Sequence, residues 1–319
     1  MSHEFHIPVL AEELLNYIPL SQKNGVYLDG TFGLGGHSCY LSSKLPSDAK
    51  IIGLEWDERL KEYHSSMPRN PMINVFYDSF RQFDFVLASQ GIPAINGALL
   101  DLGFSSVHID DDRMGFSFQK DGDLDMRYSQ DLERNAADVV NTTPEKELAR
   151  ILFRYGEEPL SKKVAREIVR RRNKQPFRKV LQLVDFLKEV LPSGKGYPWK
   201  GIRRIFQAIR IEVNQELQNL ESFLKKITSW FFQKNDWLAI ISYHSLEDRM
   251  VKQHFKELTR ECVCPEEEVV CRCEHVPDFV WVKKIIKPSS KEVEENPRSA
   301  SARMRIICRQ TDVLPASAF

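Results

Sequence analysis

An apolar run that ends in an acid leads directly into a glycine-rich turn, LDGTFGLGGHS, at residues 28–38. Four glycines fall within seven residues: Gly30, Gly33, Gly35 and Gly36. Because glycine has no Cβ and reaches positive φ, such a turn brings backbone close to a ligand, and the helix expected from His37 points its N-terminus inward. This pattern is typical of nucleotide-like cofactor binding, although a glycine-rich turn without a ligand has the same composition.

Strand and helix signals alternate through the first part of the chain. Buried strands are predicted at 26–30, 50–57, 72–78 and 95–103, with helices at 37–45 and 80–91. This alternation predicts an α/β fold with a parallel, doubly wound sheet. Ligands of such sheets bind beyond the carboxyl ends of the strands, where four acids fall: Asp29, Glu55, Asp78 and Asp101.

The alternation then stops, and strand character returns only at 236–245. We interpret the intervening residues as a mainly helical insertion, from which an amphipathic helix at 209–227 leads back to the sheet. Segments 280–287 and 302–310 are expected to close the sheet as antiparallel strands. The predicted organisation is a first sheet part at 1–107, an inserted helical domain at 108–213, and a second sheet part at 214–319.

Composition limits the class of protein. The chain is 42% hydrophobic and 28% charged, with a formal net charge of zero. It has no apolar run near the roughly 20 residues that span a bilayer, and its opening lacks the basic start and apolar core of a signal peptide. We therefore expect a cytoplasmic protein of one or two domains with no membrane partner.

The net charge of zero hides a strongly basic segment. Residues 161–210 contain fifteen Lys and Arg but three acids, a local net charge of +12. A solvated helix would explain the run at 162–174 by itself. The segment also contains four aromatic residues: Phe177, Tyr197, Trp199 and Phe206. Basic groups interleaved with rings that can stack favour nucleic-acid binding.

The spacing of the glycines bears on the cofactor. A dinucleotide site has the order G-x-G-x-x-G, whereas this chain has D-G-x-x-G-x-G-G. Glu55, at the end of the second strand, lies where ribose hydroxyls are bound. NAD and S-adenosylmethionine both need such an acid, but S-adenosylmethionine has no pyrophosphate, so the spacing favours it. Phe80 either packs on the adenine or is a core aromatic residue.

Six separated motifs together resemble the bacterial RsmH (MraW) family, from His6 to Arg305. They are HIPVLAEELL, YLDGTFGLGGHS, LLDLGFSS with RMGFSFQKDGDLDMR, IFQAIRIEVNQEL, ISYHSLEDRMVK and ENPRSASARMR. The resemblance implies methylation of the N4 amine of a cytosine at the decoding centre of 16S rRNA, with S-adenosylmethionine as cofactor and the small ribosomal subunit as partner. It also implies a class I (Rossmann-like) methyltransferase sheet with an inserted helical domain that helps to bind RNA.

The resemblance also implies a set of cofactor-binding residues: Gly35, Gly36, His37, Glu55, Phe80, Asp101 and His108. Two of them depart from the common pattern of the family. Glu55 stands where an aspartate is frequent, and His108 where many members have glutamine. Both side chains still form hydrogen bonds, so cofactor binding is expected to survive.

Asp101 and His244 are the candidate catalytic residues. Amino-methyltransferases commonly carry D-P-P-Y after the fourth strand, whereas residues 101–104 read D-L-G-F, which keeps the acid and the aromatic residue. Asp101 is therefore expected to be essential for the amine, the cofactor or both. His244 is either a proton acceptor or a structural residue beside a helix that Ser245 caps with Asp248.

Further charged residues are candidate RNA contacts or lid residues on the strength of the resemblance: Arg113, Asp125, Arg127, Arg298, Arg303 and Arg305. In the basic segment, Arg203, Arg204 and Arg210 are stronger candidates than the run 170–172. Two other functions stay open at this point, a catalytically inactive RNA-binding assembly factor and, less favoured, a nicotinamide-dependent oxidoreductase. The sequence leaves open whether the chain forms a homodimer.

Four of the six cysteines form two C-x-C pairs: Cys262, Cys264, Cys271 and Cys273. One zinc ion could take all four thiols, although C-x-C is tighter than the commoner C-x-x-C spacing. Four free or redox-labile thiols are the alternative, which the sequence alone favours. So few cysteines in a chain of this size indicate a reducing compartment.

Overall fold

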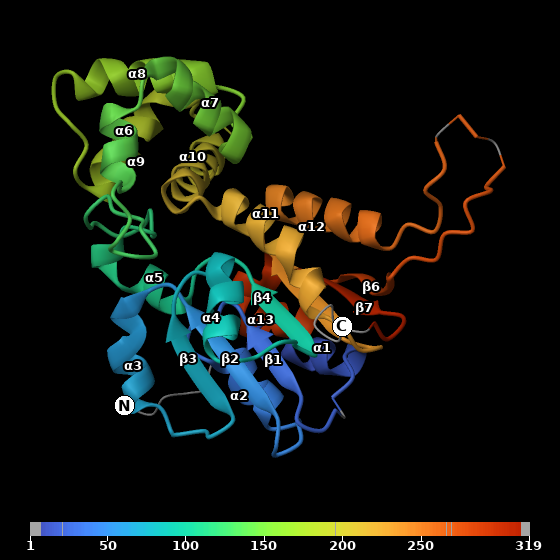
Figure 1. Ribbon diagram of the computed structural model, residues 1–319. Coiled ribbons are helices and arrows are strands. Elements are labelled where there is room, and N and C mark those ends of the chain that lie inside the picture. Colours follow the sequence, from blue (N-terminus) through green and yellow to red (C-terminus); the bar gives the residue numbers. More distant parts are fainter. Residues whose placement is uncertain (1–7, 21, 195, 266, 269, 314–319) are drawn as a thin grey trace. The chain divides into compact units, whose positions relative to one another are not determined.

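The computed structural model describes residues 8–20, 22–194, 196–265, 267–268 and 270–313 (Figure 1). The first two residues of the HIPVLAEELL motif, His6 and Ile7, lie outside this set. The chain forms two compact units, one of Met1–Gly103 with Asn219–Phe319 and one of Phe104–Gln218. The first contains the sheet, and the second, which includes the predicted insertion at 108–213, is built mainly of helices.

The sheet of the first unit has the strand order β3-β2-β1-β4-β5-β7-β6. The first five strands in this order are mutually parallel, and β7 runs antiparallel to both β5 and β6. The α/β prediction and its closing antiparallel pair are therefore confirmed. The strands are β1 (Val26–Asp29), β2 (Lys50–Glu55), β3 (Ile73–Tyr77), β4 (Gly97–Asp101), β5 (Trp237–Ser242), β6 (Phe279–Ile286) and β7 (Arg303–Arg309).

Helices cover both faces of this sheet because its central strands are apolar on both sides (Figure 1). Ala98 and Leu100 of β4 pack in one core with α4, α11 and α12, whereas Leu99 packs in the other with α1 and α2. Successive side chains of a strand alternate between faces in this way. The helices are α1 (Ala11–Tyr17), α2 (Gly36–Ser42), α3 (Lys61–Ser66), α4 (Phe83–Ser89), α11 (Glu216–Ile227), α12 (Ser245–Leu258) and α13 (Ser290–Glu295).

The second unit has its own apolar core. Its helices are α5 (Ser106–Asp110), α6 (Ala136–Thr142), α7 (Glu145–Gly156), α8 (Ser161–Arg172), α9 (Val180–Val190) and α10 (Tyr197–Asn214). Gly156 lets α7 approach α10 closely, since a Cβ there would lie 2.5 Å from the carbonyl oxygen of Arg204. Among the described residues, no helix of either unit is both long and apolar enough to cross a membrane.

The prediction of one amphipathic helix at 209–227 is wrong in one respect, because the segment contains the end of α10 and all of α11. Gln215 ends α10 in the left-handed region, with φ of 51°. Asn214 is fully buried, and its side-chain amide accepts from the N–H of Tyr128 and donates to the carbonyl of Met126. Apolar residues continue at helical spacing on both sides of this break, so the periodicity did not reveal it.

The centre of the sheet predicts a stability effect at Gly97. A Cβ on this residue would lie 2.1 Å from Cε2 of the buried Trp237. We expect Gly97→Ala to lower the free energy of unfolding by about 1–3 kcal/mol, because the overpacked ring must shift. Urea denaturation measures this change. Gly194→Ala is the control, since a Cβ there meets nothing within 4 Å, and equal midpoints for the two variants would contradict the packing.

Candidate functional site

Three acids end neighbouring parallel strands at one edge of the sheet: Asp29 of β1, Glu55 of β2 and Asp101 of β4. The sheet order reverses at β1, and ligands of doubly wound sheets bind at such a point. Asp29 is buried and accepts a 2.6 Å hydrogen bond from the hydroxyl of Ser38. The structure thus brings predicted site residues of the first unit to a common edge.

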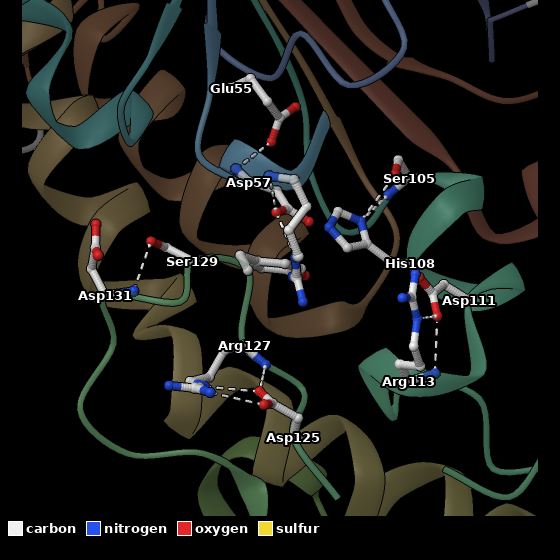
Figure 2. Close-up of polar contacts among 12 residues, drawn as sticks. Glu55, Asp57, Ser105, His108, Asp111, Arg113, Asp125, Arg127, Ser129 and Asp131 are labelled. Carbon is white, nitrogen blue, oxygen red and sulfur yellow. Dashed lines mark hydrogen bonds and ion pairs between the residues drawn. The ribbon is translucent and has the colours of Figure 1, made fainter. Parts of the chain in front are cut away.

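Glu55 fixes the glycine-rich turn to the end of β2. Its Oε2 accepts from the N–H of Gly33 at 2.8 Å. Its Oε1 accepts from the N–H of Asp57 at 2.7 Å, the contact drawn in Figure 2. Burial raises the pKa of Glu55 to about 7, while these backbone hydrogen bonds oppose the rise. Each carboxylate oxygen has two lone pairs, so Glu55 keeps acceptor capacity for a ligand hydroxyl.

The turn uses its glycines for packing as well as for conformation. Gly33 and Gly35 have φ of 52° and 75°, in the left-handed region that favours glycine. A Cβ on Gly35 would lie 2.8 Å from the ring of Phe32, and one on Gly30 would lie 2.4 Å from Leu100. These contacts show that the fold itself requires glycine at 30 and 35.

His64 of α3 is a residue of this site that the sequence reasoning missed. Its Nε2 lies 2.7 Å from the carbonyl oxygen of Gly33, and its Nδ1 lies 2.7 Å from the hydroxyl of Tyr77. Since a carbonyl only accepts, Nε2 carries the proton and Nδ1 accepts from Tyr77. Burial lowers the pKa of His64, which favours this neutral form. No motif marked a histidine 31 residues from the turn.

Asp101 is held between the turn and the end of β5. The hydroxyl of Tyr243 donates to its Oδ1 at 2.8 Å, and its backbone N–H donates to Thr31 Oγ1 at 2.6 Å. Nδ1 of His37 lies 3.7 Å from its Oδ2. Burial raises the pKa of Asp101 to about 6, whereas His37 and Tyr243 favour the ionised form. Tyr243 was the second residue missed, although it adjoins the predicted His244.

The helix cap after β5 lies one residue earlier than predicted. His244, not Ser245, is the N-cap of α12, and its Nδ1 accepts from the N–H of Glu247. Glu247 completes the capping box by accepting from the N–H groups of Tyr243 and His244. The predicted partner, Asp248, instead binds arginines of β7. The sequence is compatible with a cap at either His244 or Ser245, because both side chains can accept from a backbone N–H.

The other cofactor candidates differ in their surroundings. Phe80 begins a short 3₁₀ helix after β3, is half-buried, and meets Phe223 edge-on at a centroid distance of 5.8 Å. His108 belongs to the second unit, where its Nδ1 accepts from the N–H of Ser105 (Figure 2) and its ring packs on Phe116 and Tyr128. Its predicted role in binding the cofactor stays a prediction.

The basic segment presents fewer rings than its sequence suggests. Phe177 and Phe206 are buried in the core of the second unit, so they are not available to stack on bases. Tyr197 donates its hydroxyl to Glu158. Trp199 is 48% exposed, and the ammonium of Lys188 lies 5.1 Å from its ring centroid. Trp199 is therefore the stacking candidate that the structure keeps.

Several predicted arginine contacts are committed to ion pairs within the protein. Arg305 is buried and, with Arg303, binds the carboxylate of Asp248. Arg127 pairs with Asp125 (Figure 2) and donates to two backbone carbonyls. The remaining candidates divide by exposure: Arg113, Arg203 and Arg298 are exposed, and Arg113 is paired with Asp111. Arg204 and Arg210 are half-buried and paired with Glu158 and Glu216.

A family model described as MraW methylase family matches residues 3–310. The chain belongs to this family. It is 40% identical over 314 residues to the ribosomal RNA small subunit methyltransferase H of Syntrophobacter fumaroxidans, covering 96% of each chain. The protein of the same name from Caldicellulosiruptor saccharolyticus is 41% identical over 303 residues, covering 94% of this chain and 98% of the relative. The sheet and the helical unit described above are therefore those of a member of the MraW methylase family.

The contact between Tyr243 and Asp101 predicts a shift in titration. The hydroxyl stabilises the ionised carboxylate, so we expect Tyr243→Phe to raise the pKa of Asp101 above its value of about 6. Carbon-13 NMR of the labelled carboxyl group measures it. Tyr77→Phe removes a hydroxyl that binds His64 instead and is expected to leave Asp101 unchanged. An unchanged or lowered pKa in Tyr243→Phe would refute the assignment.

Proposed function

We propose that this chain transfers a methyl group from S-adenosylmethionine to the N4 amine of a cytosine in the decoding centre of 16S rRNA. Family membership and relatives named small subunit rRNA methyltransferases support the reaction class. The observation that carries the proposal is Asp101, a half-buried carboxylate at the carboxyl end of β4 that accepts a hydrogen bond from Tyr243. The choice of N4 of cytosine rests on the six motifs quoted above.

The acidic edge suits the cofactor that we propose. Glu55 would accept hydrogen bonds from the ribose hydroxyls, since its oxygens keep lone pairs beside the N–H groups of Gly33 and Asp57. Gly35, Gly36 and His37 would form the wall next to it, and Phe80 would face the adenine. S-adenosylmethionine, when bound, supplies a methyl group on a positively charged sulfur.

Asp101 would act on the acceptor amine. The exocyclic amine of cytosine is a poor nucleophile because its lone pair is delocalised into the ring. A carboxylate that accepts from an N–H of this amine restores lone-pair character to the nitrogen. Holding the amine in line with the methyl group lowers the activation barrier further, by about 7–11 kcal/mol at best. Tyr243 would hold the carboxylate in place and keep it ionised.

The proposal needs no general base. The methylated nitrogen is acidic enough to lose its proton to water, so His244 can serve as the cap of α12 without transferring a proton. A catalytic role for His244 stays a prediction. The proposed partner is the small ribosomal subunit, which the basic surface of the second unit, with Trp199 and Arg203 exposed on α10, would contact.

Replacement of Glu55 tests the cofactor half of the proposal. In Glu55→Gln, the side-chain NH2 replaces one of the two acceptor oxygens and must face a backbone N–H, so two donors meet. The negative charge that attracts ribose hydroxyls is also lost. We expect the Kd for S-adenosylmethionine, measured by calorimetry, to rise about tenfold or more, equivalent to about 1.4 kcal/mol. Glu58→Gln, which changes an exposed acid nearby, should leave the Kd unchanged. Equal Kd values for both variants would remove Glu55 from the site.

Replacement of Asp101 tests the acceptor half. We expect Asp101→Asn to lower the rate of methyl transfer to small ribosomal subunits by roughly a hundredfold or more, with circular dichroism unchanged, because the amide is a weaker acceptor for the amine. Asp48→Asn is the control, since this acid is exposed and precedes β2, at the opposite end of that strand from Glu55. A near-normal rate in Asp101→Asn would sink the proposal. A wild-type chain that binds subunits but transfers no methyl group would favour the assembly-factor alternative.

A further inference from the structure

The segment between α12 and β6 is long and irregular. From Thr259 to Asp278 its described residues form neither helix nor strand. Irregular segments beyond about 12–15 residues are uncommon in folded domains, and those that are ordered have a specific reason for their conformation. The four clustered cysteines lie in this segment.

Apolar burial does not hold this segment in its conformation. Val263, Val270 and Val276 are 51%, 66% and 71% exposed. Among the described residues from 260 to 276, only three are even half-buried, and all three are cysteines: Cys262, Cys264 and Cys273. Within the described part of 260–276, the side chains that turn away from solvent are therefore thiols, and their sulfur atoms lie against one another.

The four sulfur atoms form one compact group. The Sγ atoms of Cys262, Cys264, Cys271 and Cys273 all lie within 4.8 Å of one another. The Cys271 and Cys273 sulfurs are 3.5 Å apart, and those of Cys273 and Cys262 are 4.0 Å apart. A tetrahedron of thiolates at the usual Zn–S distance of about 2.3 Å has edges of about 3.8 Å. A disulfide would need about 2.05 Å, so these separations match shared coordination better.

Backbone donors also point at the sulfurs. The N–H of Val263, within the first C-x-C pair, donates to Cys273 Sγ of the second pair at 3.4 Å. The N–H of Arg272, within the second pair, donates to Cys264 Sγ of the first pair at 3.4 Å. Such donors orient metal-bound thiolates and offset part of their negative charge. The two pairs thus support each other across the group.

We propose that Cys262, Cys264, Cys271 and Cys273 bind one structural zinc ion that fixes the segment between α12 and β6. Four protein ligands close the coordination shell and leave no position for a substrate, so this metal takes no part in chemistry. Tetrahedral sulfur sites select zinc or an iron–sulfur cluster. Four sulfur atoms within 4.8 Å of one another surround one ion rather than a cluster of several, which favours zinc. Zinc binding would supply the ordering energy that apolar contacts do not.

The test uses the full-length chain purified under reducing conditions without chelator. Elemental analysis should give about one zinc per chain, and replacement of zinc by cobalt(II) should give the thiolate-to-cobalt charge-transfer band and the visible absorption of a tetrahedral site. Removing the metal with a chelator should make the segment near Cys271 the first site of limited proteolysis, while the circular dichroism of the sheet and helices persists.

Matched variants separate this site from the other thiols. Cys262→Ser and Cys271→Ser should each lower retained zinc about tenfold or more after dialysis against a mild chelator. Cys39→Ser and Cys308→Ser change the two cysteines outside the group, so these variants should retain all of their zinc. Zinc near zero with four titratable thiols in the group, two disulfides found by mass spectrometry, or iron in place of zinc would each overturn the proposal.

Discussion

The hydrogen bond between the Glu55 carboxylate and the glycine-rich turn fixes the arrangement of the acidic edge of the sheet. The carboxylate accepts from the N–H of Gly33, whose carbonyl oxygen in turn binds the His64 imidazole. Both polar groups of one glycine are therefore fixed by side chains from β2 and α3, and the left-handed conformation of the turn is set between them. The same turn is tied to the end of β4, since Thr31 Oγ1 accepts from the N–H of Asp101.

Desolvation gives this edge its chemical character. Burial raises the pKa of both Glu55 and Asp101, and the folded state therefore favours their protonation relative to the unfolded chain. Keeping Asp101 ionised near neutral pH costs folding free energy, which the hydrogen bond from Tyr243 and the proximity of His37 partly offset. Carboxylates held at such a cost are common in functional sites, because a poorly solvated acceptor binds an N–H donor strongly.

The sequence was sufficient to predict the strands and the edge at which their acids meet. Parallel buried strands are continuous apolar runs, and the acids that end them need no tertiary information to be placed. Contacts made across the fold were not predictable in this way. His64 and Tyr243 reach the site from elements without a cofactor motif, and the break at Gln215 depends on how Asn214 is buried. Phe177 and Phe206 were predicted to be rings available for stacking, but both are buried. A count of aromatic residues in a segment does not distinguish core residues from surface residues.

The proposed reaction is methylation of one cytosine of small-subunit rRNA. It is tested most directly by incubating the purified chain with isotopically labelled S-adenosylmethionine and small ribosomal subunits lacking the modification, and then mapping the labelled nucleotide by mass spectrometry. We expect one labelled cytosine in the decoding centre, with the label on N4. Label on another base, on a ring carbon or on the ribose, or none at all beside an active control enzyme, would contradict it.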